Sequence, residues 1–328
     1  MKKPLVFLFA LFFAGCSPPA AQNVETPQAE QQEQQQQQPQ PQKEITDVRA
    51  LKLVKNKDAV APFFKLMGAP EPSDWLASFK ESGQTFEEYL RENPTLPTAE
   101  RKKIYIQPIG KFSATERKIL NLVAGYMKAF YSLPVDLKPE MKLENVPKDM
   151  ERKNPYEGQR QIRTHYFIVD LLPPLLPDDA AAFISFTNID LYPDETWNFV
   201  FGQATFEKRV GVWSLYRFGN PDKSEADYKK FLARTLKIAM HETGHMFTMR
   251  HCAKYECLMS GTNHLGETDR RPLDTCPECM AKIAWAMNYE PVERYRNLAA
   301  FWETQGWTEE KELFLKKAEA LGAEASKQ

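Results

Sequence analysis

Three histidines and one glutamate have the types and the spacing of a metal site that activates water. They form the pattern His241-Glu242-x-x-His245-x-x-x-x-x-His251. On a helix, residues four apart lie on the same face, so His241 and His245 can bind one cation. His251 can supply a third ligand if the chain turns out of the helix after Phe247. Three protein ligands leave a fourth position open, which is the arrangement that catalytic zinc requires.

The chemistry expected from this pattern is the hydrolysis of a peptide bond. Zinc would polarise the carbonyl and lower the pKa of a bound water to about 7. Glu242 would act as the general base rather than as a ligand, taking a proton and delivering it to the leaving amine. The simpler interpretation is a solvated helix with structural histidines. The third histidine argues against it, because the chain holds only five histidines in all.

Four of the five cysteines form a second candidate cluster, as C-x-x-x-x-C followed by C-x-x-C. This spacing suits a closed, tetrahedral and structural zinc site. Two disulfides are the alternative in an oxidising compartment. Zinc is favoured because C-x-x-C pairs make strained disulfides and good chelates. We therefore expect two zinc ions per chain, the second on Cys252, Cys257, Cys276 and Cys279.

The two clusters together carry a family resemblance. The stretch from His241 to Cys252, then Cys257-Leu-Met259 and Cys276-Pro-Glu-Cys279, resembles the archaemetzincins, and most closely their archaemetzincin-2 branch. Residues 187–192 and 198–204 are similar to sheet segments of the same family. The similarity extends over residues 100–290, approximately the length of one catalytic domain.

The resemblance implies a compact α/β metzincin domain with peptidase activity, a catalytic zinc on the three histidines and Glu242 as the general base. It also implies a structural zinc on the four cysteines and a Met-turn at Met259 beneath the catalytic metal. An ordinary core methionine is the simpler interpretation of Met259. Because Cys252 directly follows His251, a structural zinc would hold the loop that delivers the third histidine.

One position departs from the family pattern, which has Gly where this chain has Thr248. That Gly lets the backbone leave the helix in a conformation that a β-branched residue adopts at a cost of about 1–2 kcal/mol. Either the turn is built differently or His251 is placed less well. The alternative function is therefore a zinc-bearing, peptide-binding lipoprotein of weak or no activity.

The elements that must position these residues alternate between strands and helices. Ser224 can cap a long helix that leads into His241. Ser113-Ala-Thr-Glu116 forms a capping box for a helix ending near residue 131. Further helices are expected over residues 158–172 and from just after Cys276. Strands are expected over residues 104–110, 133–137, 182–187, 198–205 and 210–217, the last two as a hairpin.

This order predicts an α/β or α+β fold with a mixed sheet and an active-site helix. We expect the run 198–206 to be an edge strand against which an extended peptide pairs, and residues 260–264 to wall the pocket beyond the scissile bond. The catalytic domain is expected to span residues 99–290. A helical extension precedes it over 45–98, and a helical hairpin follows it over 291–328 with a break at Gly306.

The N-terminus has the form of a targeting signal. Lys2 and Lys3 precede an apolar run that is too short to span a bilayer, so residues 1–15 are expected to be a signal peptide. Phe13-Ala-Gly-Cys16 resembles the lipobox of bacterial lipoproteins, which implies acylation of Cys16. An ordinary secretory signal is the alternative. Residues 16–44 are rich in Gln and Pro and are expected to be a disordered tether.

These features predict an exported bacterial lipoprotein. It would be held at the membrane by Cys16 and sorted to the outer membrane, since Ser17 follows the cysteine. Its expected partners are peptides or unfolded polypeptide. The chain has 43 Lys and Arg residues against 44 Asp and Glu residues, which gives no electrostatic reason to expect nucleic acid.

Overall fold

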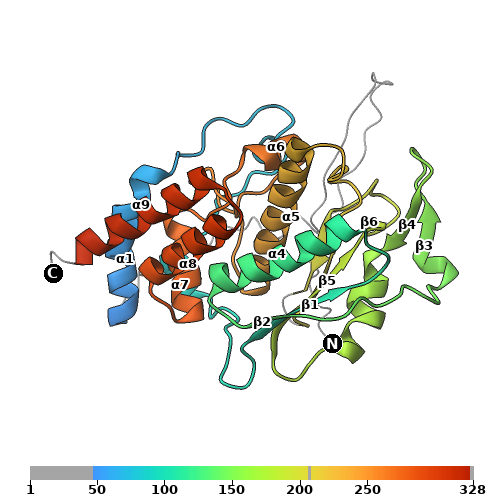
Figure 1. Cartoon of the computed structure of the whole chain (residues 1–328), viewed down its shortest axis with the longest axis horizontal. Coiled ribbons are helices and arrows are strands. Elements are labelled where there is room, and N and C mark those ends of the chain that lie inside the picture. The colour runs from blue at the N-terminus through green and yellow to red at the C-terminus, as the bar shows by residue number, and fades with distance from the viewer. Residues whose placement is uncertain (1–46, 206–207, 326–328) are drawn as a thin grey trace.

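A central sheet carries helices on both faces in the computed structural model, which describes residues 47–205 and 208–325 (Figure 1). The predicted mixed α/β class is confirmed. The predicted signal peptide, Cys16 and the predicted tether lie outside the described residues. Within the described ranges, no helix is both long and apolar enough to cross a membrane.

The central sheet has five strands, of which four are parallel. The fifth, β7 (Gly202–Ala204), runs antiparallel to β8 (Val210–Ser214) at one edge, as expected for the predicted hairpin. The predicted strand 198–205 was too long. Val200 pairs instead with Leu191 in the second sheet, so the chain changes sheets before β7 begins. The strand order is β2 (Val135–Leu137), β1 (Lys103–Pro108), β5 (Ala180–Thr187), β8 (Val210–Ser214) and β7 (Gly202–Ala204).

Successive side chains along each strand point to opposite faces of the central sheet. Both faces carry apolar side chains, because each face is covered by a core. Ile104 and Ile106 of β1 join the larger core, which includes residues of helices α4 (Ala114–Tyr131) and α5 (Glu225–Met246). Tyr105, between them, joins a smaller core with a short π-helix (Tyr166–Leu171). Helix α5 is thereby fixed against the sheet, which sets the position of its last two turns.

The predicted helix over 158–172 is wrong in its first half. Residues Arg160–Arg163 form β4 instead, and the π-helix covers only the second half. Strand β4 lies between β3 (Glu151–Lys153) and β6 (Asp190–Tyr192) in a separate three-stranded sheet. Gln161 donates a side-chain hydrogen bond of 2.9 Å to the buried Asp190, while Ile162 enters the smaller core. This alternation of polar and apolar contacts favours a strand.

Helices from both ends of the chain pack on the catalytic region (Figure 1). Arg49 of α1 (Val48–Val60) donates hydrogen bonds to the backbone oxygens of Ala284 and Tyr289 at 2.7 and 2.9 Å. The C-terminal hairpin turns at Gly306, whose φ is +70°. The other helices are α2 (Trp75–Ser78), α3 (Phe86–Arg91), α6 (Leu265–Arg270), α7 (Pro277–Met287), α8 (Pro291–Thr304) and α9 (Thr308–Ala325), with 3₁₀ turns at Ala61–Phe63, Lys148–Met150 and Pro173–Leu175.

Candidate metal centres

The last two turns of α5 bring two of the predicted ligands together. Ser224 caps the start of the helix, as predicted, by accepting a hydrogen bond from the backbone of Asp227. At the other end, Nε2 of His241 lies 2.9 Å from Nε2 of His245. Both imidazoles are buried. Bonds of about 2.05 Å to one tetrahedral zinc would separate two nitrogens by about 3.3 Å, so this spacing is close to that of a shared ion.

The backbone fixes how both rings are protonated. Nδ1 of His241 lies 2.9 Å from the carbonyl oxygen of Leu258, and Nδ1 of His245 lies 2.6 Å from that of Met249. A carbonyl oxygen only accepts, so each Nδ1 must carry the proton. Each Nε2 then offers a lone pair to the same point, which is the form in which imidazole binds a metal.

His251 reaches the same point through a left-handed turn. Helix α5 ends at Met246, and Thr248 adopts a φ of +65°. Threonine therefore makes the turn for which the family pattern has Gly. Its hydroxyl accepts a hydrogen bond of 2.9 Å from the backbone of Thr95, which offsets part of the conformational cost. One ligand atom from each of the three histidines lies within 4.8 Å of the others.

A residue of the N-terminal extension holds the third imidazole. Nδ1 of His251 lies 2.8 Å from Oε2 of Glu81 and 3.1 Å from Oε1. The neighbouring Trp75 packs edge-on against the same imidazole, with the two ring centroids 5.1 Å apart. Sequence analysis did not identify Glu81 or Trp75, since neither stands at a spacing that relates it to the histidine motif. Both contacts make the extension part of the site.

Glu242 lines a small cavity next to the histidines. The cavity has a volume of about 40 Å³ and is also bordered by His241 and His251. Oε2 of Glu242 is buried and has no hydrogen-bond partner within the described part of the chain. Two residues of the segment expected to wall the pocket, Ser260 and Thr262, line it as well. A carboxyl group with an oxygen that can accept a proton therefore borders this cavity.

Burial sets the protonation of the metal-free site. It lowers the pKa of His241 to about 3, with a further contribution from His251, and lowers the pKa of His245 well below its ordinary value. Both rings are thus neutral and able to bind a cation. Burial raises the pKa of the Glu242 carboxyl to about 8. A divalent cation beside it would favour the carboxylate form.

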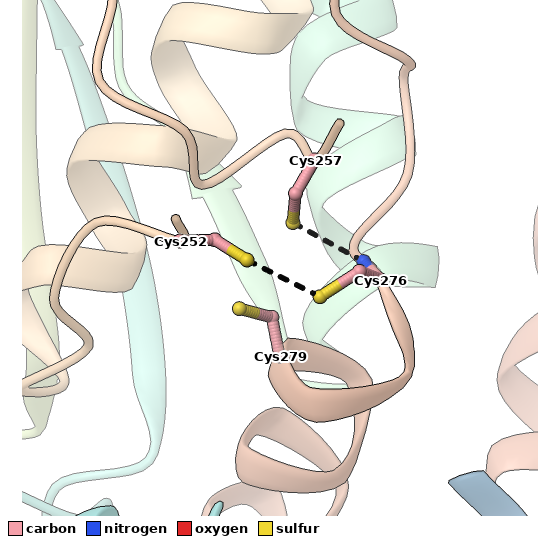
Figure 2. Close-up of side chains that lie close together, drawn as sticks. All are labelled: Cys252, Cys257, Cys276 and Cys279. Carbon is pink, nitrogen blue, oxygen red and sulfur yellow. Dashed lines mark hydrogen bonds between the residues drawn. The ribbon is translucent and has the colours of Figure 1, made fainter. Parts of the chain in front are cut away.

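The four predicted cysteines converge from two segments (Figure 2). Cys252 and Cys257 come from the loop after α5, while Cys276 and Cys279 stand at the start of α7. Their sulfurs lie within 4.8 Å of one another, and Sγ of Cys252 lies 3.5 Å from Sγ of Cys276. A disulfide needs about 2.05 Å, whereas zinc–sulfur bonds of about 2.3 Å give tetrahedral edges of about 3.8 Å. All four thiols are free.

Backbone amides surround the cysteine cluster in the way that thiolate ligands require. Sγ of Cys257 accepts hydrogen bonds from the backbone N–H of Cys276 at 3.2 Å and of Met259 at 3.4 Å. Burial raises the pKa of the Cys257 and Cys276 thiols, so several thiolates form here only beside a cation. The donor set fits a structural zinc.

Met259 lies directly beneath the active-site helix. Its side chain is fully buried, and its sulfur lies 2.7 Å from the place that a Cβ on Gly244 would occupy. Gly244 stands between Glu242 and His245, so its missing side chain lets Met259 pack against the helix at the level of the metal site. The predicted Met-turn residue thus lies against the helix that carries His241 and His245.

Comparisons with known proteins agree with this geometry. The model of Peptidase family M54 matches residues 176–285. Archaemetzincin-2 of Pongo abelii is 37% identical over 261 residues, which cover 69% of this chain and 71% of that protein. Archaemetzincin-2 of Homo sapiens is 36% identical with the same coverage. The chain belongs to the archaemetzincin family. It is therefore a zinc metallopeptidase by family.

A solved archaemetzincin from Methanopyrus kandleri is also similar, at 24% identity and a TM-score of 0.47, over 58% of this chain and 98% of that one.

The described residues of the present chain include a third cluster with ligand-like spacing, formed by Asp74, His264 and Glu267. Arginines already occupy its carboxylates: Arg270 bonds to Asp74, and Arg271 donates to Glu267 at 2.8 Å. This third cluster is a hydrogen-bonded support of the loop rather than a metal site.

Proposed function

We propose that this archaemetzincin hydrolyses peptide bonds with Glu242 as the general base and a zinc ion on His241, His245 and His251. The observation that carries the proposal is the convergence of three imidazoles, two of them fixed by backbone carbonyls and one by Glu81. Zinc held in this way supplies Lewis acidity, which polarises a peptide carbonyl and makes water acidic near neutral pH.

The residues around this site have distinct tasks. The carboxylate of Glu242 takes a proton from water and returns it to the leaving nitrogen. Strand β7 lies at the edge of the sheet, and its Gly202 borders the cavity beside Glu242. An extended peptide added to β7 would therefore bring a scissile bond to the carboxylate. Peptides and unfolded polypeptide are the substrates that such strand addition favours.

We assign a second, structural zinc to Cys252, Cys257, Cys276 and Cys279, which gives two zinc ions per chain. Support comes from the convergence of the four sulfurs and from the backbone amides that face Cys257. Cys252 also donates its backbone N–H to the carbonyl of Met259 at 2.8 Å. This cluster therefore connects the third histidine to the Met-turn.

A comparison of native protein with Glu242→Ala on a random peptide library tests the enzymatic proposal. The native protein should cleave, and the variant should lose at least about 10²-fold in rate while it retains its zinc. If neither protein cleaves any peptide although zinc is bound to both, the enzymatic proposal fails. The weak or inactive peptide-binding lipoprotein is then the better description.

The location of the protein is proposed from its first residues. A lipid on Cys16 would hold the catalytic region at the outer membrane, with residues 17–44 as a tether. The test is expression of native protein and Cys16→Ser, followed by detergent phase separation and lipid labelling. Native protein should be labelled and enter the detergent phase, whereas the variant should be unlabelled. Labelling of neither would leave the ordinary secretory signal.

A further inference from the structure

Two buried cationic side chains line the cavity that holds Glu242. Lys237 lies one turn before His241 on α5, and Arg271 follows the end of α6. Each side chain belongs to a residue that is only 8% exposed. Burying an ammonium or a guanidinium group is costly unless negative or polar partners compensate for the lost water. The partners available to these two groups therefore show whether the cavity has positive charge to spare.

Lys237 has backbone partners but no carboxylate. Its Nζ donates to the carbonyl oxygens of Thr268 and Asp269 at 3.0 and 3.1 Å. Among the described residues, no carboxylate oxygen lies within 4.0 Å of this nitrogen. The nearby Asp269 carboxylate is held by Arg234, at 2.8 and 2.6 Å. The ammonium group is thus fixed in place without a carboxylate in contact, and Asp269 and Glu310 attract its charge only from a greater distance.

Arg271 is paired on one side only. One terminal nitrogen donates to Oε1 of Glu267 at 2.8 Å. Oε2 of the same carboxylate accepts the backbone N–H groups of Trp75 and Asn263 at 3.0 and 2.7 Å. Nε of Arg271 is buried and has no hydrogen-bond partner in the described ranges of the chain. The carboxylate of Glu267 is therefore fully engaged, while the guanidinium keeps one donor to offer.

We propose that this cavity binds a carboxylate of the substrate, with Lys237 as the main partner and Arg271 as the second. The carboxylate would be the side chain of Asp or Glu just after the scissile bond, or the free C-terminus of a peptide cut near its end. This inference rests on the proposed function, since it names the substrate class of the same site.

The test compares internally quenched peptides that differ in one residue after the scissile bond. Asp and Glu peptides are measured against their Asn and Gln counterparts, each with a free and with an amidated C-terminus. Native enzyme should favour the acidic side chain, or the free C-terminus, by at least about tenfold in kcat/KM, because charged hydrogen bonds are made in a buried site. The paired termini show which source of carboxylate is recognised.

Lys237→Met should reduce to near one the ratio of kcat/KM for the preferred carboxylate-bearing peptide to kcat/KM for its amide counterpart. Lys237→Gln serves if the Met variant does not fold. Lys229→Met is the matched control, since Lys229 is an exposed lysine of the same helix. It should leave the ratio unchanged. Zinc content and thermal unfolding are measured for each variant, so that loss of the site is not mistaken for loss of preference.

Binding to Glu242→Gln separates this inference from the proposed function. Fluorescence anisotropy reports affinity for the same peptides without turnover. If native enzyme cleaves but prefers neither acidic side chains nor free C-termini, the carboxylate site is overturned while peptidase activity stands. If nothing is cleaved, a stronger binding of acidic peptides, abolished by Lys237→Met, supports the carboxylate site alone. Equal binding of acidic and amide peptides overturns it.

Discussion

Oε2 of Glu81 lies 2.8 Å from Nδ1 of His251, although the two residues are 170 positions apart in the chain. A carboxylate in this place accepts a hydrogen bond from Nδ1–H and leaves Nε2 to face the other two histidines. The N-terminal extension thereby orients the ligand that arrives from the least regular part of the site. The extension is consequently part of the catalytic unit.

Replacing Glu81 by alanine should weaken zinc binding at the histidine site by about 10- to 100-fold, because the imidazole loses the group that fixes its orientation and basicity. The measurement is competition with a chromophoric chelator, with activity followed in excess zinc. Glu71→Ala is the control, since that side chain lies on the same extension and is 65% exposed. Equal zinc affinity in Glu81→Ala and native protein would show that the contact has no influence on the ligand.

Replacing Cys279 by serine should remove one of two zinc ions per chain and lower the free energy of unfolding by several kcal/mol, since structural zinc contributes directly to folding. Affinity at the histidine site should fall too, because Cys252 is adjacent to His251. Elemental analysis and thermal unfolding are the measurements. One zinc in the native protein, together with no free thiols after denaturation and chelation, would instead establish disulfides.

Chelation should remove zinc in two steps. The histidine site borders a cavity, whereas the four cysteines would hold the proposed second zinc with four thiolates. Limited treatment with EDTA should therefore abolish cleavage while about one zinc per chain remains and the fold stays intact. Elemental analysis is paired with circular dichroism at each step. Unfolding that coincides with the first loss of zinc would contradict this order.

Gly244→Ala should be destabilising on its own, because its Cβ would lie 2.7 Å from the sulfur of Met259. Overpacking of this kind costs about 1–3 kcal/mol, against about 1 kcal/mol gained from the helix propensity of alanine. With Met259→Ala in place the clash is gone, so Gly244→Ala should then stabilise. Denaturant unfolding of the native protein, the two single variants and the double variant gives a double-mutant cycle. The same sign in both backgrounds would show that Met259 does not pack on Gly244.

Thr248→Gly should be more stable than Thr248→Ala by about 1 kcal/mol, because the position has a φ of +65° and only glycine adopts it without a steric cost. Both variants lose the hydrogen bond from Thr95, so their difference isolates the backbone. Chemical unfolding of Thr248→Gly and Thr248→Ala measures this difference in stability. Cleavage by Thr248→Gly should stay within a few-fold of native. If the Ala variant is equally stable, the turn is not strained.

Local rules explain which parts of the fold could be predicted. The caps at Ser113 and Ser224, the break at Gly306, the alternation in β1 and the strand-like run of β5 depend on residues close together in the chain. The failure over 158–172 has a different cause. Residues 160–163 become a strand because they pair with β3 and also with β6, and β6 lies outside any local window.

The sequence by itself determined the chemistry of this archaemetzincin, because ligand types and helical spacing fix which groups can share a metal ion. His241, Glu242 and His245 lie on one helix, and the cysteine pairs are short chelating motifs. Tertiary structure alone decided what surrounds that chemistry. Glu81 on His251, Met259 beneath Gly244 and Lys237 bonded to the backbone of the loop at Thr268 are contacts between segments that no spacing in the chain specifies.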